Sequence, residues 1–498
     1  MIIKTNIEEM QSYLADASNL AGGRASRVVF PETAEEAASV LAEASAARVA
    51  VTVSGAGTGV VGGRVPFGGV VLATDRLNRI GEIVAGEQGG RATVEAGVTL
   101  ADFRRAVESR GLLYPPDPTE WSCYMGGTVV TNASGARTFK YGATRRYIRR
   151  LKVALTTGDV LSLARGEVFA DAEGRMVIPL GAARTIDAQL PAYRMPRTRK
   201  HAAGYYVEPG MDALDLFIWS EGTLGVVVEI EAALLPKPAG VLSGVVFFTE
   251  EEKLLAFVRA AREASLATRA ANLPGALDAR ALEFFDAEAL NFLREKYPAI
   301  PAHARGAVFF EQETNAATEE QLMDAWLALL ERHDAALDAS WFATDERDQA
   351  RLRDFRHALP VLVNEWLARH GQRKVSTDMS VPDDDFAAML GFYQETLRAS
   401  GLQYVIFGHI GDNHVHVNIL PRDDEQAAAA RAVYGQFIAR AVAVGGTISA
   451  EHGVGKIKRD YLRALYGDEH LRRMAALKRA FDPACILGRG NIFAEEFL

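Results

Sequence analysis

Cysteine is scarce in this chain of 498 residues, which has only Cys123 and Cys485. Two cysteines without a CxxC pair exclude a disulfide framework and a zinc or iron–sulfur site built from cysteine within this chain. Long apolar runs are also lacking, because no uncharged stretch reaches the ~18–20 residues that a membrane span requires. Glu8, Glu9 and Asp16 stand where a signal peptide would be apolar. We therefore expect a cytoplasmic protein without a membrane span, either free or peripheral at the inner membrane.

An excess of positive charge is absent as well. The chain has 55 Lys and Arg against 64 Asp and Glu, for a formal net charge of −9. A nucleic-acid partner would require a basic face, so we expect none. The length is too great for a single core and predicts two or three domains.

The pattern of predicted strands and helices changes near residue 238. Before it, short strand-like runs at 48–54, 68–74 and 91–97 alternate with helical stretches such as 33–47, with Thr33 as the expected N-cap. After it, strand-like runs such as GVLSGVVFFT alternate with amphipathic helices. The stretch LLPKPAG, with two prolines and a glycine, predicts the boundary. We predict three parts, over residues 1–237, 238–435 and 436–498.

The glycine-rich stretch VTVSGAGTGVVGGRVP (51–66) formally contains GxGxxG at Gly57, Gly59 and Gly62. A dinucleotide-binding fingerprint opens a helix, but Pro66 and the glycines after it lead into another strand. Backbone N–H groups of a strand-to-strand glycine loop can instead converge on an anion, with Thr58 as a further donor. The alternative is a glycine turn without a ligand.

Three of the ten histidines lie within GHIGDNHVHVN (408–418). The pattern predicts a hairpin with a two-residue turn at 412–413, which pairs His409 with His416. Their Cβ atoms would be about 4.5–5.5 Å apart, close enough for both rings to bind one metal ion. His414 and Asn418 would share the face of His416. The alternative is a set of structural histidines.

Downstream, SAEHGVGK (449–456) offers the carboxylate of Glu451 and, next to it, His452 as a base. The alternative for these two residues is a solvated pair in a glycine-rich turn.

The order of three stretches, GAGTGVVGG, then DPT…GGTVVTNASG…KYG, then EGTLG…LLPKP, resembles the FAD-binding domain of vanillyl-alcohol-oxidase-type flavoproteins. Within them it is similar to the branch of D-lactate dehydrogenase, glycolate oxidase and D-2-hydroxyglutarate dehydrogenase. The resemblance extends over nearly the whole chain. It implies an α+β fold: a two-subdomain FAD-binding domain of the PCMH type, a cap domain with a large antiparallel sheet flanked by helices, and a C-terminal helical segment that returns to the FAD domain.

The resemblance also implies non-covalent FAD, since the first half of the chain holds only His201 and no position for a covalent histidine. The positions that it assigns to the cofactor are Ser54, Gly55, Ala56, Gly57, Thr58, Gly59, Gly62, Pro118, Thr119, Gly126, Asn132, Ser134, Gly135, Glu221, Gly225 and Val227.

The branch carries the motifs GHxGDGNLHxN and EHGxG. Matching them implies that His409, His416 and Glu451 bind a divalent metal, for which zinc is expected and manganese or iron are alternatives. Asn418 falls on a substrate position and His452 on the catalytic base. His414 replaces an asparagine of the motif. It would either be an extra polar residue in the lining of the site or a fourth ligand of the metal. The terminal NPGK pattern is also changed, to GRGN at 488–491.

A 2-hydroxy acid carries a carboxylate, for which an arginine fork is the expected partner. Arg356 stands at the position of the family's substrate arginine, and Lys374 lies near its substrate lysine. Pro360 and Ser376 stand where the family grips the second carboxylate of 2-hydroxyglutarate. We therefore predict a smaller or more apolar D-2-hydroxy acid, such as D-lactate.

The implied reaction is oxidation to the 2-keto acid. The metal lowers the pKa of the substrate hydroxyl, His452 takes its proton, and the hydride passes to flavin N5. An external acceptor, such as a quinone, a cytochrome or an electron-transfer flavoprotein, would take the electrons, and we expect a homodimer. The alternatives are a glycolate-oxidase-type FAD subunit of a larger complex and an oxygen-using oxidase.

Overall fold

A small, mostly parallel sheet forms the first layer of the computed structural model, which describes residues 1–181 and 184–498. Its strands lie in the order β1-β2-β4-β3, and β2 and β3 run parallel to β4. Helix α2 packs on it with its apolar face, and Thr33 accepts a hydrogen bond from the Glu36 N–H, as predicted for an N-cap. The bounds are β1 (Ile2–Lys4), α1 (Ile7–Met10), β2 (Arg27–Phe30), α2 (Ala34–Ala46), β3 (Val51–Ser54) and β4 (Val70–Ala73).

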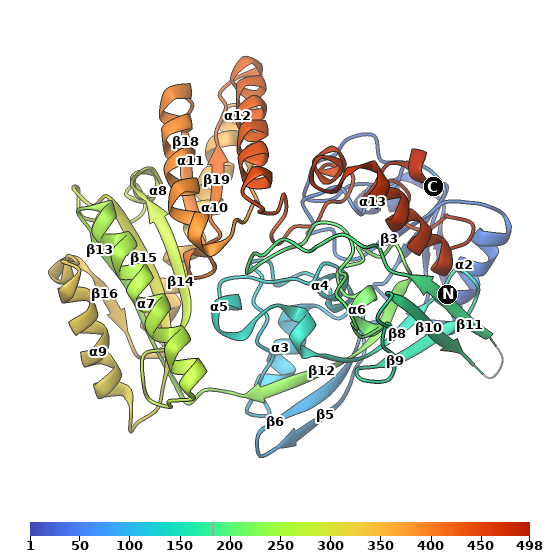
Figure 1. Ribbon diagram of the computed structural model, residues 1–498, viewed down its shortest axis with the longest axis horizontal. Coiled ribbons are helices and arrows are strands. Elements are labelled where there is room, and N and C mark those ends of the chain that lie inside the picture. Colours follow the sequence, from blue (N-terminus) through green and yellow to red (C-terminus); the bar gives the residue numbers. More distant parts are fainter. Residues whose placement is uncertain (182–183) are drawn as a thin grey trace.

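A second, antiparallel sheet completes the N-terminal half. Its strands lie in the order β5-β6-β12-β8-β9, and the short β7 also pairs with β12. The bounds are β5 (Ile80–Gly86), β6 (Gly89–Glu95), α3 (Leu100–Glu108), β7 (Leu112–Leu113), α4 (Met125–Val130), α5 (Thr138–Tyr141), β8 (Ile148–Ala154), β9 (Val160–Ala164), the hairpin β10 (Arg175–Leu180) and β11 (Arg184–Gln189), α6 (Leu214–Phe217) and β12 (Val226–Pro236). Strand β12 then runs out of this half toward the next sheet (Figure 1).

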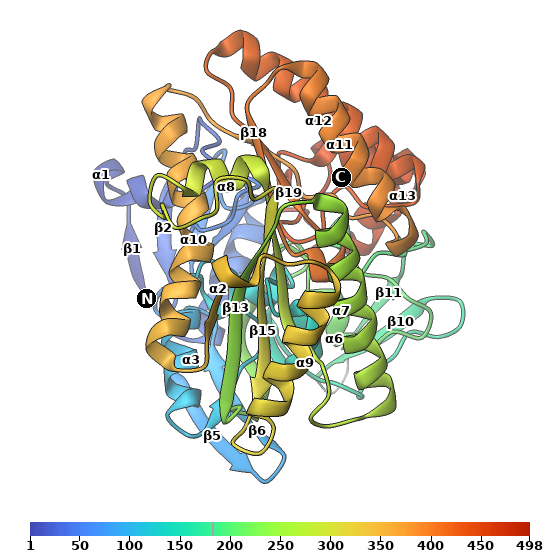
Figure 2. The same ribbon diagram turned by 90° about the vertical axis from the view of Figure 1, so that its left-hand side faces the viewer.

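A seven-stranded antiparallel sheet dominates the second half, in the order β16-β13-β15-β14-β18-β19-β17. Alternate residues of β13 face opposite sides. Val246 packs with α7 and α9, whereas Val245 packs with α8 and α10. Figure 2 shows α7 on one side of β13 and β15 and α10 on the other. The bounds are β13 (Gly240–Phe248), α7 (Glu251–Ala271), β14 (Ala279–Asp286), α8 (Ala287–Leu293), β15 (Gly306–Thr314), α9 (Glu319–Arg332), β16 (Trp341–Ala343), α10 (Glu346–Arg369), β17 (Val375–Ser376), β18 (Tyr404–Gly408) and β19 (His416–Ile419).

The C-terminal part begins with the helix pair α11 (Phe386–Ser400) and α12 (Asp424–Ala443), which pack together, and continues into α13 (Arg459–Phe481). Beyond α13, Leu487 forms a parallel bridge with Val51 of β3, so the chain ends beside the first sheet (Figure 1). The predicted boundary between residues 435 and 436 falls inside α12. The predicted α+β class, with two N-terminal sheets and a large antiparallel sheet flanked by helices, is confirmed.

The predicted register of the histidine hairpin is wrong. Strand β18 ends at Gly408, whose φ of +132° is a backbone conformation reserved for glycine, and His416 pairs with Phe407 rather than His409. A short 3₁₀ turn at 410–412 follows, and Asn413 is left-handed at φ +53°. The connection is therefore longer than two residues, and His409 lies in it, outside the ladder.

Candidate active site

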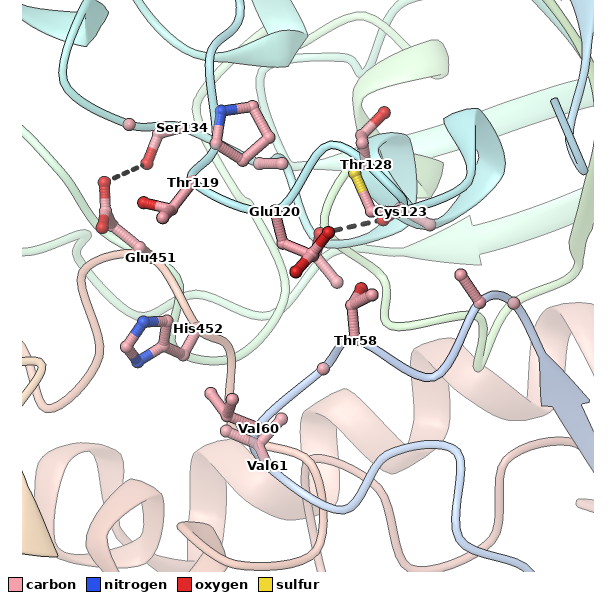
Figure 3. Close-up of a pocket in the computed structure, with 18 of the residues that line it drawn as sticks. Thr58, Val60, Val61, Thr119, Glu120, Cys123, Thr128, Ser134, Glu451 and His452 are labelled. Atoms are coloured by element: carbon pink, nitrogen blue, oxygen red, sulfur yellow. Dashed lines mark hydrogen bonds between the residues drawn. The ribbon is translucent and has the colours of Figure 1, made fainter. Parts of the chain in front are cut away.

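A cavity of about 440 Å³ lies between the N-terminal sheets and the seven-stranded sheet. One end is lined by the glycine-rich loop at 55–59, and the other by His409, His416, Glu451 and His452. Figure 3 shows Glu451 and His452 on one loop, with Glu451 reaching Ser134. The structure thus brings three distant sequence motifs to one cavity.

Most residues predicted for the cofactor line this cavity. They are Gly55, Ala56, Gly57, Thr58, Gly59, Pro118, Thr119, Gly126, Ser134, Gly135, Glu221, Gly225 and Val227. Ser54, Gly62 and Asn132 lie outside the lining: Ser54 is buried, and the Asn132 side chain accepts a hydrogen bond from the Arg145 N–H.

The glycines of this lining leave room for a bound group. A methyl group added at Gly59 or Gly127 would meet no described protein atom within 4 Å. At Gly135, by contrast, it would come within 1.9 Å of the Asp117 carbonyl oxygen, so this glycine serves close packing. A long, open, glycine-lined cavity with exposed backbone fits a dinucleotide-sized cofactor.

Residues from the C-terminal end hold the glycine-rich loop in place. Lys456 Nζ donates to the carbonyl of Gly63 at 3.2 Å and to Asn491 Oδ1 at 2.6 Å. The Asn491 amide donates to the same Gly63 carbonyl at 3.0 Å. The altered GRGN segment thus contacts the loop through Asn491.

Glu221 lines the cavity, as predicted for a cofactor position, and also holds a neighbouring loop. Its two carboxylate oxygens accept hydrogen bonds from the N–H groups of Val454 and Gly455 at 2.6 and 2.7 Å. Burial raises the pKa of Glu221, although these bonds oppose the shift. Glu221 therefore anchors the loop that carries Glu451 and His452.

Four potential metal ligands converge at the other end of the cavity. One ligand atom from each of His409, His414, His416 and Glu451 lies within 4.8 Å of the others. Glu451 Oε2 is 3.2 Å from His409 Nε2 and 3.6 Å from His416 Nε2. The three predicted ligands are therefore together despite the wrong hairpin register, and His414 joins them.

The opposite oxygen of Glu451 is held by two residues of the N-terminal half. Ser134 Oγ and Lys200 Nζ both lie 2.6 Å from Oε1. The His409 and Lys200 charges hold the pKa of Glu451 well below its usual range, although burial opposes the shift. Glu451 is thus ionised, as a metal ligand must be.

Asp378 fixes the position of His452. Its carboxylate accepts hydrogen bonds from the N–H groups of Glu451 and His452 and from Lys458 Nζ, at 3.2, 3.0 and 2.7 Å. His452 Nδ1 lies 3.5 Å from Asp378 Oδ2, and its side chain is 33% exposed, enough to reach the cavity. Burial lowers the pKa of His452 to about 4, although the Asp378 charge opposes the shift, so His452 is neutral and able to accept a proton.

Arg356 lines the cavity but is already paired. Its Nε and Nη2 atoms each lie 3.0 Å from Glu283 Oε2, and Glu283 Oε1 lies 2.7 Å from His409 Nδ1. Burial disfavours the ionised forms of Glu283 and His409. The Arg356 charge nevertheless lowers the pKa of Glu283 to about 2, and the Glu283 charge raises the pKa of His409 to about 9.

Two predicted substrate residues lie outside the cavity lining. Asn418 is 1% exposed within β19, and its amide has no hydrogen-bond partner among the described residues. Lys374 is exposed just before β17.

Sequence reasoning missed three charged residues that shape the site. Lys200 and Asp378 both lie in stretches in which the sequence analysis found no motif. Glu283 offered a signal, because it is an acid flanked by apolar residues in the interior of the strand ARALEFFD. A buried acid in such a strand requires a charged partner, here Arg356 and His409.

Comparisons with known proteins agree with this architecture. Residues 25–164 match the family described as FAD binding domain, and residues 243–492 match FAD linked oxidases, C-terminal domain. The glycolate oxidase subunit GlcD of Bacillus subtilis (strain 168) is 31% identical over 475 residues, which cover 94% of this chain and 89% of that protein. D-lactate dehydrogenase of Anaerostipes hadrus is 29% identical, over 93% and 89% of the two chains. D-2-hydroxyglutarate dehydrogenase of Stutzerimonas stutzeri (strain A1501) is 28% identical, over 99% and 96%.

Among solved structures, an alkyldihydroxyacetonephosphate synthase superposes with a TM-score of 0.66 at 14% identity, covering 98% of this chain and 81% of that one. At this identity the likeness shows the fold alone. No helix in the described part of the chain combines the length and apolar character needed to cross a bilayer.

Proposed function

The chain belongs to the FAD-linked oxidases, and on this premise we propose that it oxidises a small D-2-hydroxy acid, such as D-lactate, to the 2-keto acid. The family matches confirm the flavoprotein resemblance predicted from the motifs. The observation that carries the proposal is the convergence of His409, His416 and Glu451 with His452 at one end of the glycine-lined cavity.

FAD, when bound, supplies the acceptor for the hydride that leaves the substrate Cα. The residues that would hold it are the backbone groups of the loop at 55–59 and the segments around Thr119 and Ser134. Lys456 and Asn491 keep that loop in its position.

The donor set of His409, His416 and Glu451 suits a divalent ion, with zinc expected and manganese or iron as alternatives. The ion would supply positive charge that favours loss of the substrate hydroxyl proton. Glu283 and the Thr377 carbonyl oxygen each face the far ring nitrogen of one histidine, so both rings are oriented before any ion binds.

His452 acts as the general base in this proposal. Asp378 faces Nδ1, which leaves Nε2 for the proton of the substrate hydroxyl. The imidazolium that forms is stabilised by the Asp378 carboxylate next to it. Because the pKa of resting His452 is about 4, the ring is in its proton-accepting form at neutral pH.

Arg356 is the expected partner of the substrate carboxylate. Its guanidinium group would then contact both that carboxylate and Glu283. Lys374 is exposed and outside the cavity lining, so it offers no second cation for a distal carboxylate. These observations favour a substrate with one carboxylate over 2-hydroxyglutarate.

The test is anaerobic mixing of the purified flavoprotein with a panel of D- and L-2-hydroxy acids, followed at the flavin absorbance. We expect D-lactate or a similar small D-acid to bleach the flavin, and chelator treatment to slow the bleaching. Faster bleaching by D-2-hydroxyglutarate than by any other acid would contradict the proposed substrate, and no bleaching by any acid would contradict the proposed reaction.

A second candidate is a FAD-containing subunit of a larger glycolate-oxidising complex, which the 31% identity to the subunit GlcD favours. Bleaching of the isolated chain by glycolate, combined with turnover only after addition of partner proteins, would support it. In our proposal the isolated chain is a homodimer and needs no partner subunit. Its turnover with a quinone, a cytochrome or an electron-transfer flavoprotein would support the dehydrogenase. Stoichiometric hydrogen peroxide would instead identify an oxygen-using oxidase.

A further inference from the structure

Three histidines, rather than two, face the same oxygen of Glu451. Its Oε2 atom lies 3.2 Å from His409, 3.6 Å from His416 and 3.9 Å from His414 Nδ1. His414 is therefore only 0.3 Å farther than a predicted ligand, and it belongs to the same group of converging ligand atoms.

The far nitrogen of each of these rings faces a protein acceptor. The three pairs are His409 Nδ1 with Glu283 Oε1 at 2.7 Å, His416 Nδ1 with the Thr377 carbonyl oxygen at 3.0 Å, and His414 Nε2 with Asp378 Oδ1 at 3.5 Å. An acceptor behind the ring is the usual arrangement of metal-binding histidines, because it fixes the tautomer and turns the other nitrogen toward the ion. His414 has an acceptor in the corresponding place, although at 3.5 Å the contact is longer than those of the two predicted ligands and is not a hydrogen bond.

His414 is buried without hydrogen-bond partners in the described chain, which is expected of a metal ligand and not of an ordinary core histidine. The side chain is 0% exposed, and neither ring nitrogen makes a hydrogen bond with any residue that the structure describes. An unsatisfied buried polar group costs about 1–3 kcal/mol. The partly buried His201 shows the structural alternative, since its two nitrogens lie 2.6 Å from Thr447 Oγ1 and 3.1 Å from Tyr466 OH.

We propose that His414 is the third imidazole ligand of the divalent ion, completing a set of three histidines and Glu451. The inference rests on the proposed function only in taking this site to bind a metal. Four protein ligands fill a tetrahedral zinc site, whereas a catalytic zinc usually keeps one position open. The substrate oxygen would therefore bind by expanding the coordination to five.

The test compares zinc affinity of the FAD-loaded wild type with that of His414→Asn and His414→Gln. Each protein is stripped of metal and titrated with zinc against a chromogenic chelator. We expect both substitutions to weaken zinc binding by more than about tenfold, because even loss of an outer acceptor costs about 10–100-fold. His416→Asn should weaken binding likewise, and the exposed His303→Asn should not. Unchanged flavin absorbance identifies the folded variants.

Cobalt gives a second readout. The visible spectrum of the Co²⁺-loaded wild type should change in band position and intensity in His414→Asn, because the number of imidazole ligands changes. Wild-type zinc affinity together with a wild-type cobalt spectrum in both variants would overturn the inference, as would a wild type that binds neither metal.

These measurements need no substrate, so the two proposals fail separately. Weaker zinc binding in the variants, with no bleaching by any acid, would support the His414 assignment and contradict the proposed reaction. The reverse pattern would contradict the assignment alone.

Discussion

At the scale of single residues, Glu451 is bonded on both of its oxygens. Lys200 and Ser134 contact Oε1, and the histidines face Oε2. A buried carboxylate is stable only with such partners, because a lone buried charge loses its hydration without compensation. Lys200 compensates Glu451 from the side opposite to the metal position.

Lys200→Met should lower the free energy of unfolding by about 3–5 kcal/mol, since it removes the buried cation paired with Glu451 Oε1 and leaves only His409 on the other oxygen. Zinc should restore part of this loss, because the ion supplies the missing positive charge. Urea unfolding with and without zinc measures both effects. Lys253→Met, which breaks surface pairs with Glu250 and Asp334, is the control and should cost much less, because water screens exposed ion pairs. An equal loss in both variants would contradict the role of Lys200.

His452→Ala should keep the yellow cofactor while single-turnover flavin reduction falls by about 10²–10⁴-fold, the usual contribution of a general base. In the wild type the rate should rise as pH increases through about 4, where His452 loses its proton, and should then stay level toward neutral pH. The variant should lack this rise. An unchanged reduction rate in stopped-flow measurements would remove His452 from the role of base.

At the scale of elements, the sequence predicted those features of helices and turns that depend on neighbouring residues alone. The Thr33 cap and the left-handed tolerance of Asn413 follow from residue type, and both are present. The hairpin register failed because the end of β18 depends on the conformation of Gly408, which the letters around it do not reveal. Pairings across long separations, such as Glu283 with His409, 126 residues apart, leave no local pattern at all. The resemblance pointed to the proposed metal ligands, but not to the acceptors behind them.

The N-cap of helix α8 is Asp286, a 5% exposed residue whose carboxylate accepts a hydrogen bond from the Ala289 N–H at 2.7 Å. Burial raises the pKa of Asp286 to about 8, so the folded chain keeps a proton that the unfolded chain loses near pH 4. The contribution of Asp286 to the free energy of unfolding is therefore full below about pH 4. It decreases as the pH rises from there and is lost once the pH has passed about 8.

Asp286→Asn keeps the capping acceptor and removes this pH dependence. Relative to wild type it should gain at least about 1–2 kcal/mol between pH 5 and pH 8, measured by urea unfolding at both values. Asp345→Asn, at the exposed cap of α10, is the matched control and should show no such gain. A difference between Asp286→Asn and wild type that does not vary with pH would contradict the prediction.

At the scale of the whole molecule, ion pairs that are buried (Arg137–Glu311) or partly buried (Lys140–Glu313) join the two halves that enclose the cavity. Arg137, near α5, lies 3.0 Å from Glu311 of β15, and Lys140 lies 2.7 Å from Glu313 of the same strand. Arg280 of β14 also contacts Glu311, at 2.9 Å. Because these charges are shielded from water, the pairs fix the cavity walls relative to each other.

Glu311→Gln should destabilise the protein by about 3–5 kcal/mol, because it leaves Arg137 and Arg280 without this buried acid. The double substitution with Arg280→Met should recover part of the loss. Asp187→Asn, which breaks the exposed pair with Arg175, is the control and should cost much less, because water screens exposed ion pairs. Chemical denaturation of all three variants measures this, and equal losses for Glu311→Gln and Asp187→Asn would contradict it.

The support of the glycine-rich loop by Lys456 and Asn491 has a consequence for how the protein is made. Asn491 bonds to Gly63 across 428 positions of the chain, so the loop is unsupported until nearly the whole polypeptide has been translated. Domains fold from the N-terminus as they leave the ribosome, and the first sheet can form early. Its cofactor cavity, however, is completed only when the last helix and the segment beyond it arrive. Flavin uptake is therefore expected only once residue 491 has left the ribosome, and nascent chains that stop before residue 456 should be colourless.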